Sequence, residues 1–268
     1  PLLGPSPSRE MMGLFIRIWL PAGEIIGGHP AKAHSRPYMA FLEIQNGRDI
    51  SICGGFLVSK DFVLTAAHCK ADKITVKLGA HNIKNPRESR QEIPVRRQII
   101  HRYYNSLSQN NDIMLLQLER KAILNEHVSP IRLPLAHQQV LPGTMCSVAG
   151  WGRISTANRQ ISAILQEVDL MVMKDAACHF YHYNSTTMLC AGDPEKGKSS
   201  FKGDSGGPLV CGGTAQGIVS FGSKDGTPPA VYTRVSTFIP WIQEEMRKLS
   251  HVPLQESLQG LSFMASVL

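Results

Sequence analysis

Three short segments of the chain each place one chemically competent polar residue beside an apolar run. Ser205 lies within Gly203-Asp204-Ser205-Gly206-Gly207-Pro208, His68 follows Leu64-Thr65-Ala66-Ala67, and Asp112 precedes an apolar run. A serine hydroxyl is a weak nucleophile near neutral pH unless a neighbouring base takes its proton. Histidine can act as that base, and a carboxylate can hold its ring in the required tautomer. Together, the three residue types indicate nucleophilic attack by Ser205 on a carbonyl group.

Each of these residues also has a purely structural interpretation. The segment around Ser205 is compatible with a glycine-rich β-turn, in which the glycines bring backbone N–H groups close together. A histidine beside Cys69 is often a packed core residue or part of a thiol or metal site, and Asp112, after two asparagines, is compatible with a turn cap. The chain order His68, Asp112, Ser205 favours the joint interpretation, because it is one of the known orders of a catalytic triad.

A rival interpretation assigns Ser205 to a different hydrolase fold. Gly203-x-Ser205-x-Gly207 matches the nucleophile pattern of α/β-hydrolases, and Asp225 and His251 follow in the order that an esterase would need. That fold requires a helix directly after the serine. Here Pro208 leads into a β-like run instead, so the sequence disfavours this reading.

The elements that must position these residues are mainly short strands. The chain has 268 residues, 43% hydrophobic and 18% charged, with 23 Gly and 17 Pro, which indicates a globular protein rich in turns. Ten β-prone runs predict packed antiparallel barrels or sheets: 38–44, 55–58, 62–66, 74–78, 113–118, 147–149, 165–173, 208–210, 217–221 and 230–235. No apolar run reaches the roughly 18 residues that a membrane span needs.

One helix is predicted near the end of the chain. Ser236 is a plausible N-cap, and the apolar residues after it follow at helical spacing: Ile239, Ile242, Met246 and Leu249. Such a helix would cover one face of the sheet body.

Cysteine usage and charge constrain the compartment and the partners. Six cysteines without paired CxxC spacing favour disulfides over a metal site; spacing alone leaves all 15 pairings open. Disulfides imply an oxidising compartment, so we expect secretion or a granule lumen. The formal charge of +7 favours anionic partners, and its modest density points to glycosaminoglycan rather than specific nucleic-acid binding.

Five motifs together closely resemble the chymotrypsin-like serine proteases, especially the granzyme, cathepsin G and mast-cell chymase branch. The likeness spans about Ile25 to Arg247, and its motifs are Ile25-Ile26-Gly27-Gly28, Ala66-Ala67-His68-Cys69, Asn111-Asp112-Ile113, Ala149-Gly150-Trp151-Gly152 and Gly203–Pro208. The resemblance implies an all-β fold of two packed six-stranded antiparallel β-barrels with a C-terminal helix. It implies a serine endopeptidase with protein or peptide substrates, serpin-type inhibitors and no cofactor or metal.

The resemblance also implies roles for the residues around the nucleophile. The backbone N–H groups of Gly203 and Ser205 would form the oxyanion hole. A cut before Ile25 would free an α-ammonium that pairs with Asp204. Residues 1–24 would then be a leader ending in Gly23-Glu24, an acidic dipeptide of the granzyme type. Residues 25–249 would be the protease domain and 250–268 a C-terminal extension without assigned function.

The resemblance assigns the primary specificity pocket to Ser199 at the floor, with Gly222 and Ala230 in the walls. A neutral floor and small walls predict cleavage after Phe, Tyr or Leu, and not after Asp or Lys. Ser220-Phe221-Gly222 would pair with the substrate backbone. The implied disulfides are Cys53–Cys69, Cys146–Cys211 and Cys178–Cys190. Phe201 stands where many relatives carry a further cysteine, which marks the granzyme and chymase branch.

The remaining features of the sequence concern glycosylation, a histidine pair and an alternative function. Asn184-Ser185-Thr186 is an N-glycosylation sequon. His179 and His182 are interpreted as a solvated surface pair rather than metal ligands. An alternative function is a catalytically weak, cationic relative that binds heparin or acts against microbes. Basic residues such as Arg96, Arg97 and Arg102 would also give an active protease a heparin-binding surface.

Overall fold

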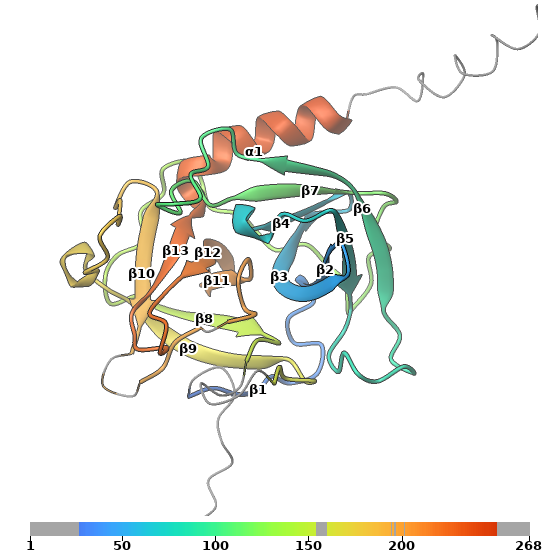
Figure 1. Cartoon of the computed structure of the whole chain (residues 1–268), viewed down its shortest axis with the longest axis horizontal. Coiled ribbons are helices and arrows are strands. Elements are labelled where there is room, and N and C mark those ends of the chain that lie inside the picture. The colour runs from blue at the N-terminus through green and yellow to red at the C-terminus, as the bar shows by residue number, and fades with distance from the viewer. Residues whose placement is uncertain (1–26, 154–159, 194, 196, 201, 251–268) are drawn as a thin grey trace, which may run out of the picture.

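The computed structural model describes residues 27–153, 160–193, 195, 197–200 and 202–250 (Figure 1). Short apolar runs separated by turns form antiparallel strands, and six of them close a first barrel in the order β2-β3-β4-β7-β6-β5. These strands are β2 (Met39–Asn46), β3 (Asp49–Ser59), β4 (Phe62–Thr65), β5 (Lys73–Leu78), β6 (Gln91–Ile100) and β7 (Met114–Leu118).

A second barrel follows along the chain. Its order is β9-β10-β13-β12-β11-β8, and pairing of β8 with β9 closes it, while the short β1 (His29–Pro30) adds to the outside of β9. The strands are β8 (Met145–Gly150), β9 (Gln166–Val172), β10 (Met188–Gly192), β11 (Pro208–Cys211), β12 (Thr214–Phe221) and β13 (Ala230–Arg234). The predicted fold class of two six-stranded antiparallel barrels is confirmed.

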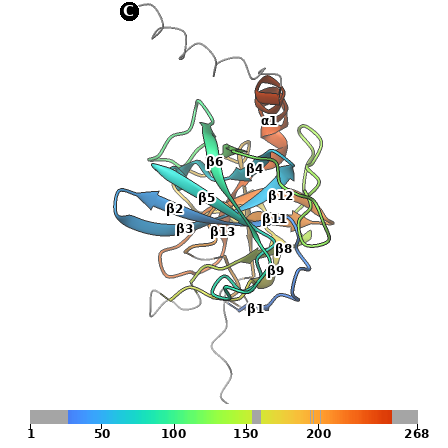
Figure 2. The same cartoon turned by 90° about the vertical axis from the view of Figure 1, so that its right-hand side faces the viewer.

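The C-terminal helix α1 (Val235–Ser250) belongs to the core of the first barrel, although it follows the last strand of the second (Figures 1 and 2). Phe238, Ile239 and Ile242 are buried in the same hydrophobic cluster as the strands of the first barrel. This burial removes apolar surface from water and ties the two halves of the chain together.

The helix begins slightly earlier than predicted. Ser236 lies inside its first turn, not at the N-cap, and is buried. Pro240 has no N–H to donate to the carbonyl of Ser236 four residues earlier. The N–H of His137 donates to that carbonyl at 2.9 Å, so a loop satisfies the group that the proline leaves open.

Two barrel strands were missing from the sequence prediction. β6 contains Pro94 and two adjacent arginines, and β10 is a five-residue segment that includes Cys190 and a glycine. Neither composition favours a strand locally. Both segments are strands because their backbones pair with a neighbouring strand on each side: β5 and β7 for β6, and β9 and β13 for β10.

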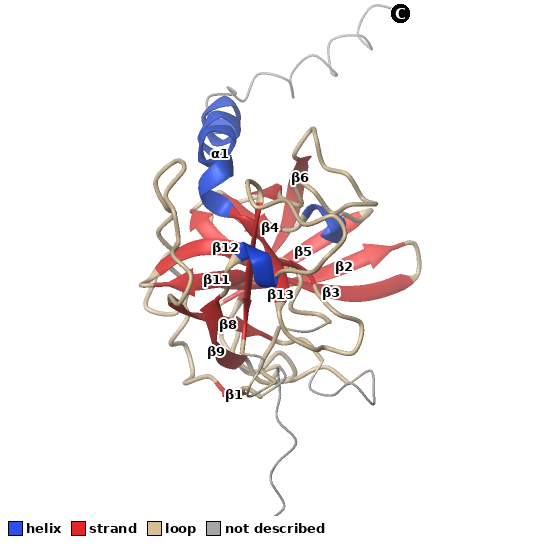
Figure 3. Cartoon of the chain, turned by 90° about the vertical axis from the view of Figure 1, so that its left-hand side faces the viewer, coloured by secondary structure: helices blue, strands red, loops and turns tan. Residues whose placement is uncertain are grey.

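Three disulfides join the pairs that the resemblance implied. Cys53–Cys69 ties β3 to the short 3₁₀ turn η1 (Ala67–Cys69), and Cys146–Cys211 ties β8 to β11. Cys178–Cys190 closes the segment between η2 (Asp175–Ala177) and β10. Helical structure in the described residues comprises α1 and these short turns (Figure 3), and no helix among them is long and apolar enough to cross a membrane.

Three histidines meet where loops of the first barrel converge. The rings of His34 and His127 stack with centroids 3.8 Å apart, and the ring of His81 lies 6.1 Å from that of His34. Burial lowers the pKa of His34, and the neighbouring histidines lower it further against the opposing effect of Glu88. Glu88 lies 3.9 Å from His34 Nε2, and Glu126 contacts His127.

The lowered pKa of His34 predicts a loss of stability in acid. At about pH 6 the unfolded chain binds a proton at His34 more readily than the folded protein does. The contribution of neutral His34 to the free energy of unfolding is therefore present above the ordinary pKa of about 6.5 and is lost as the pH falls below it. Urea unfolding at about pH 7.5 and about pH 5 should therefore show that the His34→Gln variant gains stability relative to wild type on acidification.

His127→Gln removes the ring that stacks on His34 and should therefore reduce the loss of unfolding free energy on acidification. Equal pH dependence in wild type and both variants would contradict this assignment.

Candidate active site

His68 and Asp112 meet because the end of one strand lies beside the start of its antiparallel partner. β4 pairs with β7, with Thr65 opposite Met114; η1 continues from the end of β4, and Asp112 lies just before β7. His68 Nδ1 lies 2.7 Å from Asp112 Oδ2, and the backbone N–H of His68 donates to Oδ1 at 3.0 Å. This double contact fixes the imidazole ring and leaves its other nitrogen directed away from the carboxylate.

Asp112 is fully buried, and the second barrel completes its hydrogen bonds. The hydroxyl of Ser220, on β12, donates to Oδ2 at 2.5 Å, and that of Thr233, on β13, donates to the main-chain oxygen of Asp112 at 2.8 Å. A buried carboxylate is tolerated only when such donors replace water. Sequence analysis missed these roles of Ser220 and Thr233, since nothing in their local sequence marks them.

Ser205 lies in the segment that leads into β11, and its backbone is attached to the first barrel. The N–H of Gly54, on β3, donates to the carbonyl of Ser205 at 2.7 Å, and this carbonyl lies 3.7 Å from Sγ of Cys69. Cys69 directly follows His68. The structure therefore brings the backbone of Ser205 beside the residue that follows His68, across the boundary between the barrels.

Gly206 permits this close approach. Its φ of +85° lies in the left-handed region, and a Cβ there would collide with Thr65 Oγ1 and the carbonyl oxygen of Gly54. Its N–H donates to the carbonyl of Val219 at 2.8 Å. Only glycine meets both the conformational and the steric requirement.

Asp204 is also fully buried, next to the second barrel's β8. Its Oδ1 accepts the N–H of Gly152 at 2.9 Å, and a Cβ on Gly152 would meet the same carboxylate. The predicted partner Ile25 lies outside the described residues, together with Gly23, Glu24 and Phe201.

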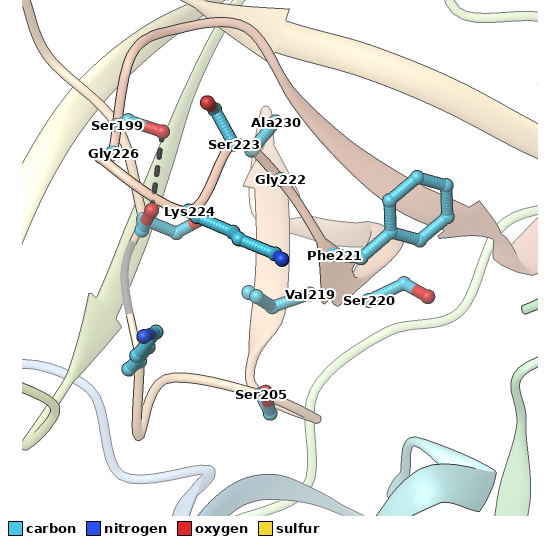
Figure 4. A pocket seen from close by; sticks show the side chains of 12 residues that line it. Ser199, Ser205, Val219, Ser220, Phe221, Gly222, Ser223, Lys224, Gly226 and Ala230 are labelled. Carbon is cyan, nitrogen blue, oxygen red and sulfur yellow. Dashed lines mark hydrogen bonds between the residues drawn. The ribbon is translucent and has the colours of Figure 1, made fainter. Parts of the chain in front are cut away.

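A pocket of about 180 Å³ opens beside Ser205, and Ser199, Gly222 and Ala230 all line it (Figure 4). Ser199 and Ala230 are each 2% exposed, so they form the closed part of the pocket. The hydroxyl of Ser199 donates to the carbonyl of Ser200 at 3.1 Å, which satisfies it within the wall. The interior is neutral and leaves room for an apolar side chain.

Two lysines that sequence analysis did not single out also line this pocket. Lys202 and Lys224 are exposed, and Figure 4 shows the Lys224 side chain reaching over the pocket between Ser199 and Ser205. Among the described residues that line the pocket, none is Asp or Glu. The pocket therefore has a neutral interior and a cationic rim, which disfavours cationic side chains.

The segment Ser220-Phe221-Gly222 borders the pocket at the end of β12. The β12–β13 register shifts between Val219 and Phe221, a local irregularity of the ladder. The Phe221 ring packs edge-on against Phe180, with centroids 5.5 Å apart. This contact joins the strand to the loop that precedes β10.

The structure contradicts the α/β-hydrolase interpretation. The chain after Ser205 enters strand β11 rather than a helix. Asp225 is exposed, and hydrogen bonds from Ser223 Oγ and the Thr227 N–H lower its pKa to about 2, so its carboxylate is engaged within its own loop. His251, the third residue of that interpretation, lies outside the described residues.

The remaining candidates lie on the surface. His179 and His182 are exposed, as expected, and Asn184 is exposed on the same loop. Within the described part of the chain, no group of three or more His, Cys, Asp or Glu is arranged to hold a metal ion.

Comparisons with known proteins extend over most of the chain. A family model described as Trypsin matches residues 25–242. Duodenase-1 of Bos taurus is 58% identical over 229 residues, covering 85% of this chain and 91% of that protein. Granzyme H of Homo sapiens is 56% identical over 229 residues, covering 84% and 92%. The solved structure described as "Structure of GrC" has a TM-score of 0.80 at 48% identity, covering 83% of this chain and 100% of that chain.

The close approach at Gly206 can be tested by substitution. Gly206→Ala should lower the free energy of unfolding by about 2–4 kcal/mol, because it adds a steric collision to an unfavourable φ. Gly212→Ala is the matched control: Gly212 also has a positive φ, +56°, but no atom lies within 4 Å of its added Cβ. That control should cost only about 1 kcal/mol. Equal losses in urea unfolding would show that the barrels do not meet tightly at Gly206.

Proposed function

The chain belongs to the trypsin family of serine endopeptidases, in the branch of the granzymes, cathepsin G and mast-cell proteases, and from this premise we propose that Ser205, His68 and Asp112 form its catalytic triad. The observation that carries the proposal is the 2.7 Å contact between His68 Nδ1 and the fully buried Asp112 carboxylate. Similarity to known proteins supports membership of the family. The catalytic roles of the three residues are assigned from this contact and from the position of the Ser205 carbonyl beside Cys69.

The chemistry proceeds through an acyl-enzyme. His68 takes the proton of Ser205 Oγ as this oxygen attacks the peptide carbonyl, and Asp112 stabilises the resulting imidazolium. His68 then gives the proton to the leaving amine as the C–N bond breaks. A water molecule then attacks the acyl-enzyme ester, and His68 again takes the proton. Collapse of this second intermediate restores the Ser205 hydroxyl and releases the acid product.

The oxyanion of each tetrahedral intermediate is stabilised by the backbone N–H groups of Gly203 and Ser205. Gly203 has a φ of +100°, which turns its peptide in a way that most residues avoid. In such sites one donor typically contributes about 3 kcal/mol to transition-state binding.

The pocket supports chymotrypsin-like specificity. Ser199, Gly222 and Ala230 leave a neutral interior for Phe, Tyr or Leu, and burial of that side chain supplies the binding energy. Lys202 and Lys224 at the rim repel substrates with Lys or Arg at the cleaved position. The substrate backbone adds as a strand along Ser220-Phe221-Gly222.

Cleavage of a mixed peptide library tests both the triad and the pocket. Protein beginning at Ile25 should cut after Phe, Tyr or Leu, and Ser205→Ala should abolish the cuts because no acyl-enzyme can form. Ser199→Asp should increase cleavage after Lys or Arg relative to Phe by about tenfold or more, since a carboxylate at the floor pairs with a cation.

Cuts after Asp or Lys by the wild-type protein would keep the triad but refute the pocket assignment. Cutting that survives Ser205→Ala would refute the triad.

We further propose that activation frees Ile25 to pair with Asp204. The support is that the Asp204 carboxylate is fully buried and accepts the N–H of Gly152, because a paired cation stabilises a buried carboxylate. Residues 1–24 would be the leader, 25–249 the protease domain and 250–268 a C-terminal extension. Removal of Gly23-Glu24 would then be the last activating cut.

Protein that retains Gly23-Glu24 should show no measurable cleavage of a Phe peptide, because its α-ammonium is displaced from Asp204. Treatment with a dipeptidyl peptidase that exposes Ile25 should restore activity, and the Ile25 form serves as control. Full activity of the uncut form would contradict the proposed ion pair.

A basic surface supports a second role in binding heparin-like proteoglycan. Arg96, Arg97 and Arg102 are exposed on or just after β6, and the chain carries a formal charge of +7. Sulfated polysaccharide is the anionic partner expected in a secretory granule, where we place the stored protein. Serpin-type inhibitors are proposed as further partners, by resemblance.

A further inference from the structure

The only N-glycosylation sequon of the chain, Asn184-Ser185-Thr186, lies in the loop between η2 and β10. Asn184 is exposed. The N–H of Thr186 donates to Asn184 Oδ1 at 3.0 Å, so this contact engages the side-chain oxygen and not the nitrogen to which a glycan is joined. The side chain is thus held in a turn at the surface, and its amide nitrogen remains available for attachment of a glycan.

Contacts on both sides fix the position of this sequon. Thr237, in the first turns of α1, donates its hydroxyl to the carbonyl of Thr186 at 2.7 Å. Arg234 Nε donates to the carbonyl of Ser185 at 3.1 Å, and the Tyr183 hydroxyl donates to Asp175 at 2.5 Å. A group attached to Asn184 would therefore start from a defined place.

That place borders the active site. Thr187 Oγ1 donates to Asn110 Oδ1 at 3.0 Å, and Asn110 is two residues before Asp112. In the same loop, Phe180 packs against Phe221 of the substrate strand. The loop before β10 and the segment before Asp112 thus meet at one side of the candidate active site, which we call one end of its substrate cleft, and Figure 1 shows the loop projecting beside β10.

In the function proposed above, the substrate backbone lies along Ser220-Phe221-Gly222, and Phe221 of that segment contacts this loop through Phe180. We propose that Asn184 carries an N-glycan that narrows this end of the cleft, so that the enzyme cuts flexible, extended peptides in preference to folded proteins. The proposal rests on the proposed function. A glycan is bulky and hydrophilic, so it blocks approach of a large folded partner while a single extended strand still passes.

The test uses the full chain secreted from glycosylating cells and then processed to begin at Ile25. Thr186→Ala removes the sequon and keeps Asn184, whereas Ser185→Ala keeps the sequon and serves as the matched control. The contacts described above use Thr186 N and O and Ser185 O, so both variants retain them. Enzymatic removal of the glycan from folded wild-type protein gives the same comparison without a substitution.

Intact mass reports whether Asn184 is occupied, and kcat/KM is measured on a short Phe peptide and on a folded protein that presents the same sequence. For Thr186→Ala and for the deglycosylated protein, kcat/KM on the folded substrate should rise about threefold or more. On the peptide it should stay unchanged, and Ser185→Ala should match wild type on both substrates.

An unoccupied Asn184, no gain, or an equal gain on both substrates would overturn the inference. Absence of cleavage that depends on Ser205 on either substrate would overturn the proposed function, and this inference with it.

Discussion

The buried carboxylate of Asp112 is the constraint on which the rest of the structure depends. A charge with no access to water is tolerated only when hydrogen-bond donors surround it. His68 supplies two contacts from the first barrel, while Ser220 and Thr233 reach Asp112 from the second. Ser220 donates to the carboxylate itself and Thr233 to the main-chain oxygen, so docking of the second barrel completes the hydrogen bonds of Asp112.

The same docking determines where Ser205, the proposed nucleophile, lies. Ser205 belongs to the second barrel by sequence, but its carbonyl is bound by Gly54 of the first. Gly206 allows the two backbones to approach, and the Cys53–Cys69 disulfide holds the neighbouring turn. The interface between the barrels thus brings together the three distant segments that hold the residues of the proposed triad.

The proposed specificity depends on the loops around this interface. The pocket has a small, neutral interior at Ser199 and Ala230, whereas its rim carries Lys202 and Lys224. A substrate side chain would therefore meet apolar surface inside the pocket and positive charge at its rim. The loop before β10 also contacts this site, because Phe180 packs against Phe221, and the same loop carries the sequon.

The sequence by itself determined the fold class and most strands, and it supplied the three residues of the proposed triad, because each is recorded in a local motif or an apolar run. It missed β6 and β10, whose compositions do not favour strands and which form because partners flank them. It also missed the bond from Ser220 to Asp112 and the approach of Lys224 to the pocket. These features arise from contacts between segments far apart in the chain. Only the tertiary structure decides them, since local propensity carries no information about which distant groups will meet.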